Sequence, residues 1–162
     1  GETGQMSIYN GLVAAKKASE GQKAIVLIHD GVRPFINEKT ITDNIKSVES
    51  YGSAITTSIV KETILVVKKD ESIDYVPDRA ASRVAKAPQS FWLDDIMAAH
   101  KEAQKEGKND YIDSCTMMKR FGYTLFLVDG PYENIKITTP DDFYTMRALL
   151  DAREDAQLYV GD

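Results

Sequence analysis

The chain has 162 residues, 43% of them hydrophobic, and a formal net charge of -5. This size fits one globular domain with a substantial core, and the mild acidity argues against a protein that binds nucleic acid through bulk positive charge. No apolar run is long enough to span a membrane, and the single cysteine, Cys115, excludes an intramolecular disulfide, so we expect a soluble cytoplasmic protein.

Hydrophobic periodicity predicts alternating helices and strands in the first part of the chain. We expect a helix over residues 7–18, a strand over 23–28 and a second helix that ends at Gly52. Runs of β-branched residues predict two further strands, over residues 54–60 and 63–67.

A hairpin-like arm follows these strands. The polar turn at residues 68–72 joins the apolar run 63–67 to a second apolar run at 73–76. The arm contains too little apolar surface for a core of its own, so we expect residues 62–86 to pack on a neighbour such as a second subunit.

Helices also dominate the rest of the chain. The pattern predicts helices over residues 91–106 and 112–121 and a strand over 123–128. Pro140, which follows a capping threonine and precedes two acids, begins a last helix that runs to about residue 154. Alternating strands and helices predict an α/β protein: a three-layer α/β/α sandwich with a mainly parallel sheet and a protruding β-arm.

Charged residues at the strand ends are the candidates for chemistry. The apolar run 25–28 stops at Asp30 and Arg33, and ligands in open α/β sheets lie just beyond such strand ends. Asp30 could hold a metal ion there, and Arg33 could bind a phosphate through two hydrogen bonds. Lys136 precedes the last helix, where an anion is favoured and where an ammonium would stabilise charge on a transferring phosphate. The set indicates metal-assisted phosphoryl or nucleotidyl chemistry.

Each candidate also has an ordinary structural explanation. Asp30 could cap a turn, Arg33 could pair with a surface acid, and Lys136 could be a solvated surface lysine. For His29 we favour a hydrogen bond to the backbone over a catalytic role. Taken one at a time, these residues leave the function open.

The order and spacing of three motifs narrow the choice. His-Asp-x-x-Arg-Pro at 29–34, Ala-Pro-Gln at 87–89 and Asn-Ile-Lys-Ile-Thr at 134–138 resemble the cytidylyltransferases that act on polyol phosphates, along nearly the whole chain. That family includes enzymes for 2-C-methyl-D-erythritol 4-phosphate and for ribitol 5-phosphate. The resemblance implies a Rossmann-like nucleotidyltransferase fold and a reaction that moves CMP from CTP to a polyol phosphate with Mg²⁺ and releases pyrophosphate. The segment at residues 134–142 argues against a sugar-1-phosphate nucleotidyltransferase of related fold.

The resemblance also implies roles for individual residues. Lys136 and Arg33 would be catalytic, and Asp30 would ligate Mg²⁺. In relatives the arm reaches across a homodimer into the partner's site. The residues expected to bind the polyol phosphate are Glu62, Thr63, Arg79 and Thr138, and those expected to bind the nucleotide are Gly1, Glu2 and Ser7.

Several departures from the family pattern bear on activity. The glycine-rich loop that cradles the CTP phosphates, and a catalytic lysine after it, are not found within residues 1–162. Gly4 stands where relatives usually have arginine, Glu62 where they have aspartate, and Ala87 where threonine is common. We therefore expect residues 1–162 to be the C-terminal portion of a single cytidylyltransferase domain, a poor catalyst alone although its parent is an enzyme. The alternative is a non-catalytic nucleotide-binding or dimerisation module.

The expected identity of the polyol depends on the particular residues within two of the motifs. Residues 30–35 and 136–139 favour the ribitol branch, which makes CDP-ribitol for cell-wall or capsular polymers. The erythritol branch, which makes an isoprenoid precursor, is the alternative.

Overall fold

The computed structural model describes residues 1–158. Among these residues, no helix is both long and apolar enough to cross a bilayer. The elements in chain order are α1 (Gly4–Ala18), β1 (Ile25–Ile28), α2 (Glu38–Tyr51), β2 (Ser53–Ile59), β3 (Val66–Val67), β4 (Ile73–Tyr75), β5 (Arg83–Trp92), α3 (Leu93–Lys105), α4 (Ser114–Arg120), β6 (Leu127–Asp129) and α5 (Pro140–Leu158).

The main sheet has four strands in the order β1-β5-β2-β6. β2 and β6 pair in parallel, whereas β5 runs antiparallel to both of its neighbours, β1 and β2. Three of the four strands therefore point the same way, and β5 makes the sheet mixed. The α/β class is confirmed. The sheet differs from the mainly parallel one that we expected in that β5 is antiparallel to its neighbours.

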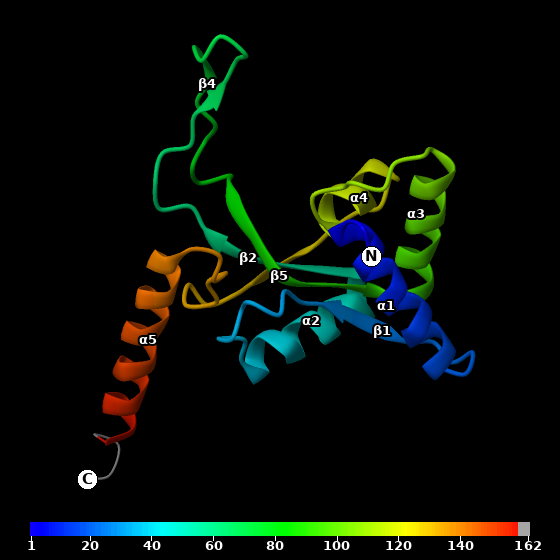
Figure 1. The fold of residues 1–162 in the computed structure, drawn as a ribbon, viewed down its shortest axis with the longest axis horizontal. Helices are drawn as coiled ribbons and strands as arrows, with labels where there is room; N and C mark the ends of the chain where they lie inside the picture. Colours follow the sequence, from blue (N-terminus) through cyan, green and yellow to red (C-terminus); the bar gives the residue numbers. More distant parts are fainter. Residues whose placement is uncertain (159–162) are drawn as a thin grey trace.

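Helices cover both faces of this sheet, which gives the three layers (Figure 1). On one face, Val48 of α2 packs with Ala54 and Val128. On the other face, α1, α3 and α4 pack over Ile55 and Phe91. Ala54 and Ile55 are neighbours in β2, so the alternation of side chains along a strand sends one into each half of the core.

Strand β5 was missed from sequence, and the helix expected at residue 91 begins later. Phe91 and Trp92 pair with β1, so the helix α3 starts at Leu93. Pro88 disfavours a central strand because it lacks an N–H donor, and prolines inside sheets are found at irregularities. Here the register of the β2–β5 ladder shifts between Ile55 and Thr57, opposite the segment that contains Pro88.

Most helix ends follow the sequence signals. Gly52 ends α2 with a left-handed backbone, φ 87°, which glycine adopts without strain because it has no Cβ. Thr3 caps α1 through the N–H of Met6, so α1 begins three residues before the helix predicted from residue 7.

His100 of α3 is 1% exposed, and its ring centroid lies 5.5 Å from that of Tyr9.

The arm stands out from the body of the molecule as a two-stranded hairpin of β3 and β4 (Figure 1). The hairpin is present as predicted, although the strand expected over residues 63–67 is confined to Val66–Val67. Its turn is closed by the N–H of Lys68, which donates to the carbonyl of Ser72 at 2.9 Å. Apolar side chains along the arm are about half exposed: Leu65, Val67, Ile73, Tyr75 and Val76.

Candidate active site

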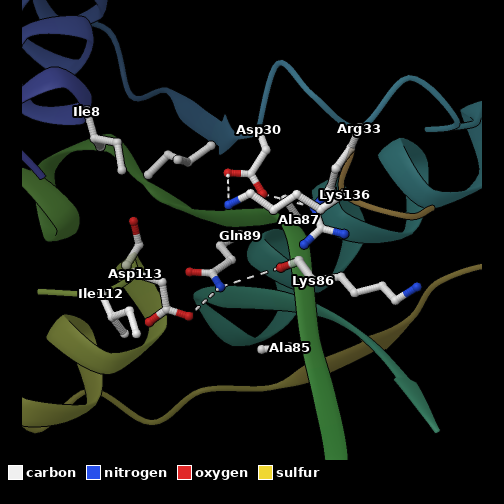
Figure 2. Close-up of a pocket in the computed structure, with 12 residues that line it drawn as sticks. Ile8, Asp30, Arg33, Ala85, Lys86, Ala87, Gln89, Ile112, Asp113 and Lys136 are labelled. Carbon is white, nitrogen blue, oxygen red and sulfur yellow. Dashed lines mark hydrogen bonds and ion pairs between the residues drawn. The ribbon is translucent and has the colours of Figure 1, made fainter. Parts of the chain in front are cut away.

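A cavity of about 280 Å³ opens where β1 ends beside β5 (Figure 2). Segments far apart in the chain meet there: the loop after β1, the middle of β5, the start of α4 and the loop before α5. The charged and polar residues of the lining are Asp30, Arg33, Lys86, Gln89, Asp113, Ser114 and Lys136.

Asp30 is the centre of a small ionic cluster in this cavity. Its Oδ2 accepts a hydrogen bond from Arg33 Nε at 2.9 Å, and its Oδ1 lies 3.5 Å from Lys136 Nζ. The backbone N–H of Ile137 donates to the carbonyl of Val32 at 2.9 Å, which ties the two loops together. The structure therefore brings together the three residues that the sequence marked for metal binding and catalysis.

The electrostatics of the cluster keep the carboxylate charged. Burial raises the pKa of Asp30, but the hydrogen bond from Arg33 and the charges of Lys136 and Arg33 outweigh it, and the net pKa is lowered. Asp30 is thus an anion at neutral pH, which is the form that binds a cation.

Lys86 is a functional candidate that sequence reasoning missed. It is only 8% exposed, and its ammonium donates to the carbonyls of Tyr132 at 2.9 Å and Asn134 at 3.3 Å. Burial lowers the pKa of Lys86, and the positive charges of Arg33 and Lys61 lower it further. A lysine inside a buried strand would have been the signal, but strand β5 itself was not recognised.

Gln89 and Asp113 line the opposite side of the cavity and fix the start of α4. Gln89 Nε2 donates to Asp113 Oδ2 at 3.0 Å, and Gln89 Oε1 accepts from the N–H of Cys115 at 2.7 Å. Asp113 Oδ1 caps α4 by accepting from the N–H of Thr116 at 2.8 Å. Gln89 belongs to the Ala-Pro-Gln motif at residues 87–89, but sequence analysis assigned no role to either residue.

Three predicted substrate residues lie at the base of the arm, outside the Asp30 cavity. Glu62 lines a second cavity of about 400 Å³ that Lys86 also borders. Its neighbour Thr63 is exposed, and Arg79 donates to the carbonyl of Lys61 at 3.4 Å.

Thr138 lies two residues after Lys136 and helps to begin α5. Its N–H and hydroxyl donate to Asp142 Oδ2 at 2.9 and 3.1 Å, and the N–H of Thr139 donates to the same oxygen at 2.8 Å. These hydrogen bonds lower the pKa of Asp142 to about 2, and the one from the Thr138 backbone N–H has the largest effect. The Thr138 hydroxyl is therefore engaged in the helix cap in this state.

Gly1, Glu2 and Ser7 lie at the start of α1, and all three are exposed. They are not brought into the cavity lining, but Ile8, the next residue, is part of it. A Cβ on Gly1 would come within 2.5 Å of the backbone nitrogen of Ser7, so this segment is packed closely against the first turn of α1.

Asp30 is the residue of this cavity that could hold a magnesium ion together with a phosphate ligand. Mg²⁺ takes oxygen ligands, keeps several waters and is commonly held by one or two carboxylates together with substrate phosphates. Asp30 supplies one such carboxylate. Within residues 1–158 no group of three or more His, Cys, Asp or Glu side chains could hold a metal ion by itself.

A three-layer α/β fold with a cationic, carboxylate-bearing pocket beyond a strand end is the class of structure that handles phosphorylated ligands. The family relationship makes this specific. The sequence model of the IspD family, 2-C-methyl-D-erythritol 4-phosphate cytidylyltransferase, matches residues 1–152. The chain belongs to this family, as the motifs predicted.

Relatives from both branches are similar to the chain. A ribitol-5-phosphate cytidylyltransferase from Streptococcus agalactiae serotype III is 55% identical over 159 residues, which are 98% of this chain and 66% of the relative. A 2-C-methyl-D-erythritol 4-phosphate cytidylyltransferase from Clostridium acetobutylicum is 41% identical over 150 residues, 93% of this chain and 63% of the relative. The crystal structure of 4-diphosphocytidyl-2C-methyl-D-erythritolsynthase from Anaerococcus prevotii matches with a TM-score of 0.80 and 29% identity, over 91% of this chain and 66% of that one. The chain thus spans 66% of the length of its streptococcal relative.

Proposed function

We propose that the chain carries the acceptor and metal site of a CTP-dependent cytidylyltransferase that converts a polyol phosphate to a CDP-polyol. The observation that carries the proposal is the convergence of Arg33 and Lys136 on Asp30 at 2.9 and 3.5 Å. Membership in the IspD family supports the same reaction.

The proposed reaction is an in-line displacement at phosphorus. A phosphate oxygen of the acceptor forms a bond to the α-phosphorus of CTP, and the bond from this phosphorus to the bridging oxygen breaks, so the electron pair leaves with pyrophosphate. No covalent enzyme intermediate is needed, because positioning and charge stabilisation supply most of the catalysis. Lys136 and Arg33 would stabilise the charge that builds on the equatorial oxygens.

Asp30 would hold the Mg²⁺ of this reaction. The bound ion would neutralise and orient the phosphate oxygens. Arg33 contributes to this site by keeping Asp30 ionised, as the lowered pKa of that carboxyl indicates. Gly1, Glu2 and Ser7 would contact the nucleotide from the start of α1, and Thr138 would exchange its hydrogen bond to Asp142 for one to the acceptor phosphate.

Ribitol 5-phosphate is the acceptor that we propose. The ribitol relative from Streptococcus agalactiae is 55% identical and one from Vibrio parahaemolyticus is 47% identical, against 41% for the methylerythritol relative named above. These values support the preference that the motifs gave.

We also propose a homodimer in which the arm of each subunit completes the site of the other. The arm exposes a row of apolar side chains and has no core of its own, which favours a partner. Arg79 would then contact the acceptor bound to the partner subunit, whereas Glu62 and Thr63, at the edge of the second cavity, would contact the acceptor of their own subunit. The cytoplasmic location stays a prediction.

The test is pyrophosphate release by the full-length gene product that contains this chain. With CTP and Mg²⁺, we expect turnover with ribitol 5-phosphate and its loss when EDTA removes the metal. Turnover with 2-C-methyl-D-erythritol 4-phosphate alone would make the ribitol assignment wrong. No turnover with either acceptor would favour the non-catalytic module instead.

A further inference from the structure

Lys86 is, within the described chain, the single residue that lines both the Asp30 cavity and the second cavity at the base of the arm. In Figure 2 its side chain extends away from Gln89 and Asp113 on the other side of the site. A ligand that begins at Asp30 and continues into the second cavity, of about 400 Å³, would pass the Lys86 ammonium.

The hydrogen bonds of Lys86 leave one donor for such a ligand. An ammonium has three N–H groups. Two of them serve the carbonyls of Tyr132 and Asn134, at 2.9 and 3.3 Å. The third has no hydrogen-bond acceptor among residues 1–155, although Lys86 is only 8% exposed, and the ring centroid of Tyr132 lies 5.3 Å from its Nζ. Because an unsatisfied buried donor costs free energy, a ligand oxygen at this position would be favoured.

The charges around Lys86 point to the same kind of ligand. The charged groups that act on it, Arg33 and Lys61, are both positive, and burial together with these charges lowers the pKa of Lys86. A buried cation without an anionic partner is stabilised by an oxygen-rich, anionic ligand. The second cavity has polar walls, Ser58, Lys61, Glu62 and Tyr132, as well as aliphatic ones, and Lys86 is the polar residue that it shares with the Asp30 cavity. Those aliphatic walls are Ile59, Ile64, Val84 and Ile135.

We infer that Lys86 determines acceptor specificity by donating its third N–H to a chain hydroxyl of an unbranched polyol phosphate. This inference rests on the proposed function and deepens it. Ribitol 5-phosphate has four hydroxyl-bearing carbons besides the one that carries the phosphate, whereas 2-C-methyl-D-erythritol 4-phosphate has three and a methyl branch, so the ribitol chain offers one more hydroxyl along this path. A desolvated ammonium gains a charge-assisted hydrogen bond from a hydroxyl and none from a methyl group.

The experiment compares the two acceptors in Lys86→Met full-length gene product. We expect kcat/KM for ribitol 5-phosphate to fall about 10- to 100-fold, mainly through KM, because one charge-assisted hydrogen bond is lost. Two values should stay within about threefold of those of the unmodified protein. They are the KM for CTP and, for methylerythritol phosphate, the KM as a substrate or the inhibition constant as a competitive inhibitor.

Two further variants keep the experiment decisive. Lys86→Gln retains two N–H donors for the backbone carbonyls and should show the same loss of selectivity even where Lys86→Met folds poorly. Lys23→Met is the matched control, since Lys23 Nζ lies 3.6 Å from the ring centroid of Trp92 and lines neither cavity.

The outcomes separate this inference from the proposed function. Equal losses for both acceptors would mean that Lys86 only supports the loop of Tyr132 and Asn134, and unchanged selectivity would likewise overturn the inference. Use of methylerythritol phosphate alone by the unmodified protein would overturn it too. If the unmodified protein transferred CMP to neither acceptor, the proposed function itself would fail.

Discussion

The Asp30 carboxylate and the Lys136 ammonium, 106 positions apart in the sequence, lie 3.5 Å from each other. Their side chains are 37% and 48% exposed, so water screens the pair and its contribution to folding is small. Because both side chains are accessible, a ligand can bind the ammonium and the carboxylate without the cost of breaking a buried contact.

Replacement of Lys136 should therefore separate activity from stability. We expect Lys136→Ala to lower kcat of the full-length gene product by about 10²- to 10³-fold, because the group that stabilises charge in the transition state is lost. The free energy of unfolding should change by less than about 1 kcal/mol, as for other exposed ion pairs. Pyrophosphate release and urea unfolding measure the two effects. A large loss of stability with normal kcat would contradict the assigned role.

Arg33 should control the pKa of Asp30. The hydrogen bond from Arg33 is the largest influence that lowers this pKa, whereas burial raises it. In Arg33→Gln we expect the pKa of Asp30 to rise, so that the carboxylate is lost at a higher pH as the solution is acidified. Carboxyl ¹³C NMR titration measures this directly. Arg83→Gln is the control, because Arg83 donates to the carbonyls of Ala80 and Ser82. An unchanged titration of Asp30 in Arg33→Gln would refute the explanation.

Mixed dimers should reveal whether the arm acts on the partner. Subunits with Arg79→Ala and subunits with Lys136→Ala should each be nearly inactive alone. In a mixed dimer, one site combines an intact Lys136 with an intact Arg79 from the other subunit, so an equimolar mixture should recover about a quarter of full activity. Pyrophosphate release after subunit exchange measures the recovery. No recovery, or a monomeric mass in sedimentation, would count against arm exchange.

Acid should destabilise the fold through His100. Burial lowers the pKa of His100 from 6.5 to about 4. The unfolded state thus binds a proton in the pH range where the folded state does not, so the His100 contribution to stability is complete above pH 6.5 and is lost as pH falls to about 4. Urea unfolding at pH 7 and pH 5 should show this fall. It should be smaller in His100→Phe, which still packs against Tyr9, and an identical fall in that variant would show that other groups are responsible.

Local signals predicted the helices, the arm and the ionic cluster well. Gly52 and Pro140 mark helix ends through their own backbone geometry, and a charged turn after an apolar run is a local pattern at Asp30 and Arg33. The predicted backbone hydrogen bond of His29 is confirmed, since its Nε2 lies 2.9 Å from the carbonyl oxygen of Arg33.

Strand β5 and its lysine could not be predicted in the same way. Gln89 and Ser90 have hydrogen-bond partners distant in sequence, and no local pattern indicates those partners. Ser90 donates to Asn44 at 2.8 Å, and Gln89 donates to Asp113 at 3.0 Å. A strand with polar residues and a proline is interpreted as a loop until such partners are known.

The position of β5 between β1 and β2 has a consequence for synthesis on the ribosome. β1 and β2 are not neighbours in the finished sheet, and each must wait for β5, which is translated after both of them. The nascent chain therefore cannot close its sheet early, and the slow, non-local step of folding comes when that late strand is inserted. A cell that makes this protein would have to shield the two waiting strand edges from other chains until then.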